Sequence, residues 1–427
     1  MILRDPVHGL VSFESEEDAI VPRLLAAAEV QRLRRIRQLG LTSLAFPGAE
    51  HTRFAHAVGA AHVMQRFLAR LRQIDGALPF WQRPTSERGR DALAAALLHD
   101  LGHGPLSHLF EEALPGAVKH EKWTREILLD PASDVHRILR TDDPSMPARV
   151  ADLVVGKCEL PYLGNAVSGV FDVDRCDYLL RDAQATGVIY GDFDLPWMLR
   201  SLRFRPAKGG EAPGLAIDGL KGITAIESFL LARLFMFQQV YFHKSTRAAE
   251  FMIGAILRRA IHLLSDGIVL PARVDALDRI AAGDEPTLGE YLALDDVVLL
   301  SAMRAWEASS DAVLAGLCQR LRARELWKTL ELGNVESAKE PAEAHAIAED
   351  IARARGMDPA YFVGVDRASD MPVTDTADLE VVFPDGRTRE LTEVSFLLRN
   401  LRGQRLSRTR LIFAPELRDE IRAALVG

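Results

Sequence analysis

The first three quarters of the chain carry apolar residues at three- and four-residue intervals, the spacing of helices that bury one face. Residues 91–100 (DALAAALLHD) are apolar almost all round, which predicts a helix buried within a bundle. The same spacing predicts helices over residues 23–37, 52–73, 86–101, 107–113, about 222–264 and about 295–324.

The pattern changes after about residue 325, where short extended segments replace the helical spacing. Residues 326–332 (LWKTLEL) and 409–415 (TRLIFAP) predict strands, and a short helix is expected from residue 415 to the end. Residues 377–394 (ADLEVVFPDGRTRELTEV) predict a hairpin around a Pro-Asp-Gly turn.

Turn-forming residues also gather at 206–213, which predicts a small hairpin inserted among the helices. We therefore expect a mainly α protein, in which a helical bundle over residues 1–324 holds this hairpin and precedes an α+β lobe over residues 325–427. A chain of 427 residues is long enough for a large core, and 48% apolar and 26% charged residues are typical of a globular protein.

Charge and cysteine content narrow the class of protein. A formal net charge of −8 argues against a protein that coats nucleic acid by bulk charge, although it does not exclude a local basic groove. Three cysteines without a CxxC pair exclude a disulfide scaffold and favour a reducing compartment. The first ten residues do not form a signal peptide, and we find no apolar run near the ~20 residues of a membrane span. We expect a cytoplasmic protein with no membrane partner.

Histidines are concentrated in one part of the chain, with seven of the twelve between residues 51 and 120. A single histidine in a helix is usually an ordinary hydrogen-bonded side chain, but clustering suggests chemistry. The pair His99-Asp100 ends the most apolar predicted helix, where an unpaired carboxylate costs several kcal/mol. These two side chains are therefore expected to be paired or bound to a metal.

Further carboxylates follow in GVFDVDRCDYLLRD, where helical spacing places Asp174, Tyr178 and Asp182 on one face with Arg175 beside it. Two imidazoles and two carboxylates around a divalent ion leave coordination positions open for water and a substrate oxygen. The residues by themselves therefore predict a catalytic metal site.

Four ordered motifs, HTRFAHAVG, HDLGHGPLSHLF, HEKWT and FDVDRCDYLLRD, together resemble those of the HD-domain phosphohydrolases. More narrowly, they are similar to the deoxynucleoside triphosphate (dNTP) triphosphohydrolases, including the bacterial dGTPase-like enzymes and the vertebrate dNTPase that carries a SAM domain. The resemblance begins at DPVHG, includes QRLRRIRQLG and VYFHK, and extends into the C-terminal lobe. It implies an HD-domain helical bundle over residues 1–324.

The resemblance implies a role for each matching side chain. The metal ligands would be His56, His99, Asp100 and Asp174. Proton transfer beside the reacting phosphate would fall to His108, Glu111 and His120, with His108 as the acid that Glu111 orients. The substrate would be bound by phosphate contacts, sugar contacts and a pocket histidine, namely Arg53, Arg175, Tyr178, Arg233, Gln38, Asp182, Tyr241 and His103.

The activity that the resemblance implies is cleavage of a dNTP to deoxynucleoside and triphosphate by water attack at the α-phosphorus. One Mn, Fe, Zn or Ni ion per site would serve as cofactor, and Mg²⁺ can accompany the nucleotide. A homo-oligomer, dimer or tetramer, and activation by a second nucleotide are further expectations, with Arg32 and Arg34 as effector phosphate contacts. The alternatives are an HD hydrolase acting on another nucleotide or phosphoester, and a nucleotide-sensing regulator without turnover.

Overall fold

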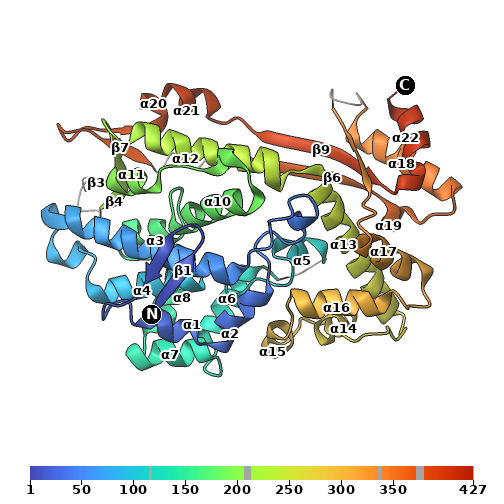
Figure 1. The fold of residues 1–427 in the computed structure, drawn as a ribbon, viewed down its shortest axis with the longest axis horizontal. Coiled ribbons are helices and arrows are strands. Elements are labelled where there is room, and N and C mark those ends of the chain that lie inside the picture. The colour runs from blue at the N-terminus through green and yellow to red at the C-terminus, as the bar shows by residue number, and fades with distance from the viewer. Residues whose placement is uncertain (115–117, 206–212, 334–338, 372–378, 427) are drawn as a thin grey trace.

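The computed structural model describes residues 1–114, 118–205, 213–333, 339–371 and 379–426. Helices dominate, and the sheets are small, so the expected mainly α class with strands toward the C-terminus is confirmed (Figure 1). The turn of the predicted inserted hairpin, residues 206–212, lies outside the described residues.

The centre of the bundle is the helix α4 (Ser86–Leu98), packed against α3 (Arg53–Ile74) and α8 (Met146–Val154). Every residue from position 92 to 98 is fully buried, as the all-round apolar sequence predicts. Helix α10 (Val173–Thr186) packs on α3. The Asp172 side chain accepts the Arg175 N–H at its start, and Gly187 ends it with φ of 76°, in the left-handed region.

Shorter helices surround this centre. The predicted helix over 23–37 is divided into α1 (Ile20–Leu25), α2 (Ala28–Arg32) and a 3₁₀ turn (Leu33–Arg35). The other helices of this half are α5 (His108–Ala113), α6 (His120–Leu129), α7 (Asp134–Asp142), α9 (Pro161–Val167) and α11 (Leu195–Arg200).

The two long helices predicted over 222–264 and 295–324 are each broken. α12 (Ile223–Met236) continues as a π-helical turn over Phe237–Tyr241, and α13 (Lys244–Ser265) starts anew after His243, whose side chain accepts the Ser245 N–H. Asp311 likewise caps a new helix, so the second segment is α16 (Asp296–Trp306) and α17 (Ala312–Arg322). Two further helices lie between them, α14 (Asp275–Ala281) and α15 (Leu288–Leu292).

The continuous helix Ile223–Tyr241 is 19 residues long with a mean hydropathy of 1.2, which by length and composition suffices to cross a membrane. On those two criteria the expectation that no segment is apolar enough is wrong. Core helices of globular proteins meet the same criteria, and Phe229 and Met236 of this helix are fully buried in the bundle.

A four-stranded sheet joins the inserted hairpin to the C-terminal part of the chain. Its order is β3 (Leu202–Arg205), β4 (Gly214–Asp218), β7 (Glu380–Val382) and β8 (Thr388–Glu390), with β4 and β7 parallel. The predicted hairpin over 377–394 is confirmed by the antiparallel pair β7 and β8. The division at residue 324 stays a prediction, and strands from both sides of it share this sheet.

A second, antiparallel sheet has the order β5 (Lys328–Glu331), β9 (Leu406–Phe413) and β6 (Val363–Asp370). The two predicted strands are β5 and β9, whereas β6 was not predicted. The remaining C-terminal helices are α18 (Pro341–Ala354), α19 (Pro359–Phe362), α20 (Leu391–Val394), α21 (Phe396–Leu401) and α22 (Arg418–Leu425). An N-terminal hairpin, β1 (Ile2–Asp5) with β2 (Gly9–Ser12), completes the fold.

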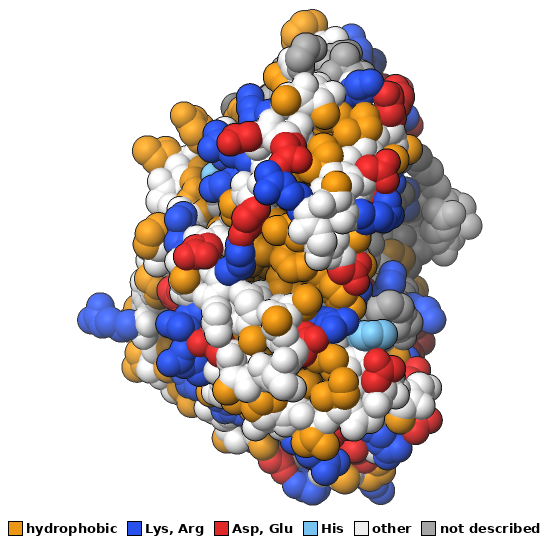
Figure 2. Space-filling model, turned by 90° about the vertical axis from the view of Figure 1, so that its right-hand side faces the viewer, with side chains coloured by type: hydrophobic (Ala, Val, Ile, Leu, Met, Phe, Trp, Pro, Cys, Tyr) orange, Lys and Arg blue, Asp and Glu red, His pale blue; other side chains and the backbone are white. Residues whose placement is uncertain are grey.

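Two hydrophobic cores form, one around α3, α4 and α10 and one around α13, α16 and α17. Leu39 packs against the first core and Leu41 lies in the second, and both line one cavity of about 570 Å³. The cavity therefore lies where the two cores meet. The molecular face on the C-terminal side carries acidic and basic side chains interspersed around a central hydrophobic area (Figure 2).

Candidate active site

Three helices bring four predicted metal ligands together. His56 lies on α3, His99 and Asp100 follow the last turn of α4, and Asp174 lies in the first turn of α10. The two Nε2 atoms are 3.2 Å apart, and Asp174 Oδ1 lies 3.1 and 3.4 Å from them. The Asp100 carboxylate oxygens lie 3.6 Å from His56 Nε2 and 3.5 Å from His99 Nε2.

This donor set fits a divalent metal. The Nδ1 atom of His99 is engaged with the Ala96 carbonyl at 2.9 Å, and that of His56 with Asp177 at 2.8 Å, so both Nε2 atoms are left facing each other and two carboxylates. Burial lowers the pKa of His56, but the carboxylates of Asp174 and Asp177 outweigh it and raise the pKa to about 10. The centre therefore attracts positive charge, and its mixed imidazole and carboxylate ligands suit Mn, Fe, Zn or Ni.

The fully buried Asp177 contacts His56, a predicted metal ligand, on the side away from Asp174. Its Oδ2 contacts His56 Nδ1, its Oδ1 lies 2.7 Å from His8 Nε2 in the N-terminal hairpin turn, and Arg181 donates to both oxygens at 2.8 and 2.9 Å. A Cβ on Gly59 would lie 1.8 Å from Asp177 Oδ1, so only glycine leaves room for the carboxylate. A carboxylate on the second nitrogen of a metal-binding histidine fixes its tautomer and orientation.

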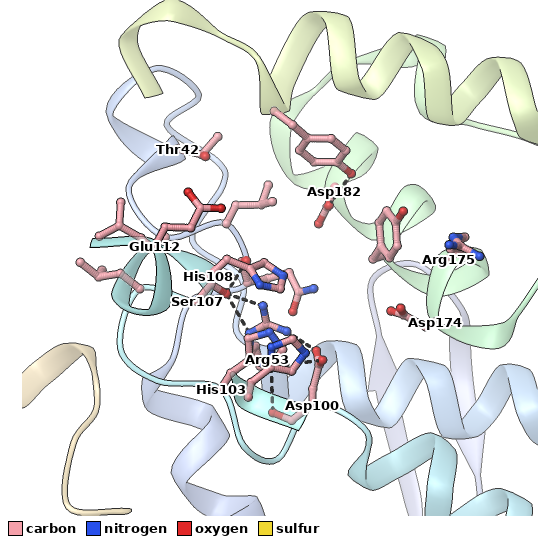
Figure 3. A pocket seen from close by; sticks show the side chains of 18 of the residues that line it. Thr42, Arg53, Asp100, His103, Ser107, His108, Glu112, Asp174, Arg175 and Asp182 are labelled. Atoms are coloured by element: carbon pink, nitrogen blue, oxygen red, sulfur yellow. Dashed lines mark hydrogen bonds and ion pairs between the residues drawn. The ribbon is translucent and has the colours of Figure 1, made fainter. Parts of the chain in front are cut away.

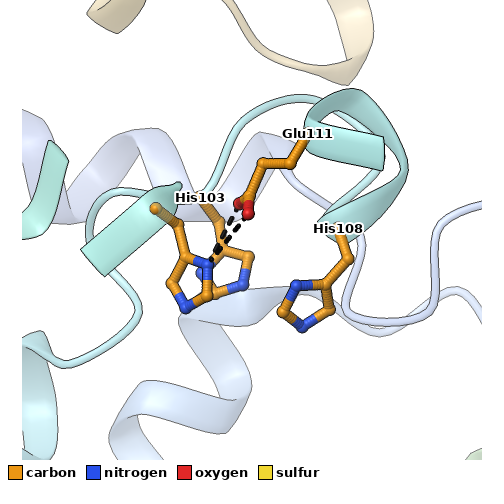
Figure 4. Close-up of side chains that lie close together, drawn as sticks. His103, His108 and Glu111 are labelled. Carbon is orange, nitrogen blue, oxygen red and sulfur yellow. Dashed lines mark hydrogen bonds and ion pairs between the residues drawn. The ribbon is translucent and has the colours of Figure 1, made fainter. Parts of the chain in front are cut away.

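A second cluster lies beside the metal ligands and consists of His103, His108, His120 and Glu111 (Figure 4). The rings of His103 and His120 are stacked at 3.8 Å, and His108 lies 4.8 and 5.1 Å from them. Glu111 contacts His120 Nδ1 at 3.0 Å and not His108, which differs from the expectation that Glu111 orients His108. Burial, then Arg53 and His120, lower the pKa of His108 to about 4.

The loop before His108 is held in a strained conformation. Leu106 and Ser107 have φ of 58° and 66°, which costs roughly 1–3 kcal/mol per residue for side chains other than glycine. The Leu106 N–H donates to Asp296 Oδ1 at 2.7 Å, and Arg53 Nε donates to Ser107 Oγ at 2.8 Å while its guanidinium also pairs with Asp100. Arg53 thus joins the strained loop to the metal ligands.

Most of the predicted substrate contacts line the 570 Å³ cavity (Figure 3). Asp174 and Arg175 lie at one end, with Arg53 and His103 near the centre. The residues of the predicted set that line it are Gln38, Arg53, His103, Arg175, Tyr178, Asp182 and Tyr241, together with His99, Asp100, His108, His120 and Asp174. The structure therefore gathers candidate phosphate, sugar and metal contacts around one cavity.

Both carboxylate oxygens of Asp182, which lines the cavity, make hydrogen-bond contacts. The Tyr241 hydroxyl donates to its Oδ2 at 2.8 Å, and His51 Nε2 contacts its Oδ1 at the same distance. Gln38 Oε1 is buried without a partner among the described residues. His51 is not among the predicted site residues, and its contact with Asp182 makes it a support for the cavity wall.

Some predicted residues lie elsewhere. Arg233 is not part of the cavity lining; it donates to Asp370 at 2.9 Å and its guanidinium lies 5.3 Å from the Phe237 ring centre. Glu111 contacts His120 from outside the lining. Arg32 is buried and donates to the carbonyls of His103 and Leu294, so the expectation that it binds an effector phosphate is wrong.

The sequence did not predict the end of the cavity that faces away from Arg175. Five polar residues line it, Thr42, Glu112, Thr246, Arg247 and Glu250. Only their closeness in sequence to predicted site residues could have pointed to them, since they follow Gln38, Glu111 or Tyr241 by one to nine residues. Burial raises the pKa of Glu250 to about 7 against the lowering effect of Arg247.

Comparison with known families agrees with this geometry. Residues 53–142, which hold the first three metal ligands and the histidine cluster, match the HD domain, and residues 194–426 match the HD associated region. The chain belongs to the HD-domain phosphohydrolases.

Individual relatives extend over most of the chain. The uncharacterized protein YwfO of Bacillus subtilis is 34% identical over 97% of this chain and 92% of its own length. A deoxynucleoside triphosphate triphosphohydrolase SAMHD1 homolog of Dictyostelium discoideum is 27% identical over 82% of this chain and 64% of its own length. A crystal structure of a phosphohydrolase from Bacteroides thetaiotaomicron superposes with a TM-score of 0.81 at 29% identity, over 97% of this chain and 99% of that one.

Proposed function

We propose that this HD phosphohydrolase cleaves dNTPs to deoxynucleoside and triphosphate by attack of water at the α-phosphorus. The observation that carries the proposal is one cavity whose lining holds His99, Asp100 and Asp174, with His56 behind them at 3.1 Å from Asp174, together with the Tyr241–Asp182 pair. The SAMHD1-type relatives, which are dNTP triphosphohydrolases by name, support the same substrate class.

Each part of the cavity wall has a chemical task in this reaction. His56, His99, Asp100 and Asp174 would hold a divalent metal, which would supply charge stabilisation and activate a water. Arg53, Arg175 and Tyr178 bind and neutralise phosphate oxygens along the wall. The histidine cluster lies beside the metal ligands and moves the proton that the leaving 5′-oxygen needs; within it, Glu111 orients His120 through Nδ1.

The sugar is selected by the fixed pair of Tyr241 and Asp182. Their 2.8 Å hydrogen bond leaves the tyrosine ring against the cavity, where it occupies the space that a ribose 2′-hydroxyl would need. Asp182 and Gln38 are then left to bind the 3′-hydroxyl, and the buried unpartnered Gln38 Oε1 is an acceptor suited to it.

Product analysis tests the proposal. Metal-reconstituted protein is incubated with each dNTP alone and in mixtures, and products are separated by chromatography. Deoxynucleoside with intact triphosphate is the expected result, and Asp174→Ala should lose both bound metal and hydrolysis while keeping the fold. Release of orthophosphate or pyrophosphate would place the protein in another hydrolase class, and full activity of Asp174→Ala would refute the metal site.

For the effector nucleotide, the proposed site is a separate cavity of about 440 Å³. Five cations and no acidic residue line it among the described residues, namely Lys244, Arg324, Lys328, Arg418 and Arg422. Trp327 also lines this cavity and offers a fluorescence signal for nucleotide binding. Dependence of hydrolysis on a second nucleotide, lost in Lys328→Glu, is the expected outcome, and light scattering with and without nucleotide tests the proposed homo-oligomer.

A further inference from the structure

The two ends of the cavity carry different charged groups. Arg175 and Arg53 lie at the end and centre that hold the predicted metal ligands, where a bound divalent ion would offset the carboxylates of Asp100 and Asp174, whereas Glu112 and Thr42 lie at the opposite end (Figure 3). A triphosphate is repelled by carboxylates and attracted by guanidinium groups. A nucleotide bound with its phosphates near Arg175 therefore directs its base toward Glu112. This orientation rests on the proposed function.

The far end of the cavity is rich in hydrogen-bond acceptors. Arg247 is already engaged, because it donates to Glu250 Oε2 at 2.7 Å and to Asp366 Oδ1 at 2.9 and 2.7 Å. Glu112 is exposed, lines the cavity and makes no hydrogen bond or ion pair within the described ranges, although the charge of Arg247 attracts it. The carboxylates thus outnumber the single cation, and the uncommitted carboxylate is the one that a ligand meets.

A buried hydroxyl at the same end is a second, independent sign of a ligand. Thr246 is 2% exposed, lines the cavity, and its Oγ1 has no hydrogen-bond partner among the described residues. A buried hydroxyl without a partner is costly, so it is expected to be satisfied when the cavity is filled.

We propose that Glu112, supported by Thr246, reads the base and selects nucleotides whose base carries an exocyclic amino group. A carboxylate accepts N–H donors, and cytosine, adenine and guanine each present an amino group. Uracil and thymine present a carbonyl oxygen at the corresponding position, and this oxygen would be repelled by the carboxylate because both groups are hydrogen-bond acceptors. Glu112 is thus a specificity-determining residue at a position that belongs to no sequence motif.

The sharpest test uses dCTP and dUTP, which differ at position 4 of the ring by an amino group against a carbonyl and in the protonation of N3. We expect kcat/KM for dCTP to exceed that for dUTP by about tenfold, the discrimination typical of one good base-edge contact. Glu112→Gln should bring the two values together, because an amide both donates and accepts. Thr246→Val should reduce the ratio in part. Glu126→Gln, at an exposed site on α6, is the matched control and should keep the ratio.

The outcomes separate this inference from the proposed function. Equal kcat/KM values for dCTP and dUTP with hydrolysis intact overturn the base contact and leave the dNTPase proposal standing. A wild-type preference that Glu112→Gln leaves unchanged, in a variant whose circular dichroism matches the wild type, also overturns it. No hydrolysis of any dNTP overturns both.

Discussion

Replacing Asp177 by asparagine should weaken metal binding although all four predicted ligands remain. Both oxygens of the Asp177 carboxylate accept hydrogen bonds, which come from His56, His8 and Arg181. Asparagine has one acceptor oxygen and one NH₂ group, so its NH₂ group must point at side chains that themselves donate hydrogen bonds. If the NH₂ group faces His56, the imidazole must accept at Nδ1 and carry its proton on Nε2, the atom needed for the metal.

The magnitude follows from this geometry. Loss of a carboxylate behind a metal-binding histidine typically costs 10–100-fold in metal affinity, or about 1.4–2.7 kcal/mol. The fold should also lose stability, because breaking a buried ion pair costs about 3–5 kcal/mol. Arg181 keeps a second partner in Asp5, at 2.9 Å, so the lower end of that range is expected.

Titration with Co²⁺, followed by its visible absorption, measures the affinity independently of turnover. Asp5→Asn is the matched control, because Asp5 also binds Arg181 but does not contact His56. We expect both variants to melt earlier than the wild type and only Asp177→Asn to lose metal. Equal Co²⁺ affinity in the two variants would show that Asp177 supports the fold and not the ligand.

Further predictions concern the protonation of His56, the discrimination between ribose and deoxyribose, and the stability of the hydrophobic core. The pKa of His56 is raised from 6.5 to about 10 in the metal-free protein, so a binding metal must displace a proton. The apparent affinity of the protein for the metal should therefore rise about tenfold per pH unit between pH 7 and 9. Calorimetry in buffers of different ionisation enthalpy measures the proton release, and an affinity that does not change with pH contradicts the prediction. For the same reason, the stability that protonated His56 gives the metal-free fold should be complete below pH 6.5 and be lost as the pH rises toward 10, which thermal melts can follow. Tyr241→Ala should let ATP compete with dATP, and unchanged discrimination would remove the ring as the sugar gate. Trp306→Ala should destabilise by about 3–5 kcal/mol, since the ring is fully buried and its Nε1 donates to Ala272 at 2.9 Å; Trp306→Phe should cost less in denaturant unfolding.

Local patterns in the sequence singled out His99, Asp100 and Asp174 as candidate metal ligands, whereas His56 was added only by the family resemblance. His99 and Asp100 end a helix with no polar face, so the cost of burying an unpaired carboxylate there already requires a partner or a metal. Asp174, Tyr178 and Asp182 share a helical face by spacing alone, and all three line the cavity. Asp177 is the neighbour of Tyr178 on the same helix but contacts His56 on α3 and does not line the cavity, and nothing in its spacing showed that it supports His56.

Helix ends and long-range pairs were harder to predict. Apolar spacing continues through residues 222–264 and does not show the break at His243, which depends on one side chain capping a new helix. The strand β6 was missed, because it pairs with β9 across 35 residues of intervening chain. The parallel pairing of β4 with β7 is likewise a contact that no local pattern encodes.

The sequence by itself determined the helical class, the family and a set of candidate metal ligands, since these follow from periodicity, ordered motifs, residue type and short spacing. Only the tertiary structure decided which residues support them: His8 lies 169 residues from Asp177, and Glu111 binds His120 where proximity in sequence favoured His108. It also decided that Arg32 is buried and that Glu112 and Thr246 end the cavity. Side-chain contacts between distant segments depend on how the two cores pack against each other, and packing is a property of the whole chain.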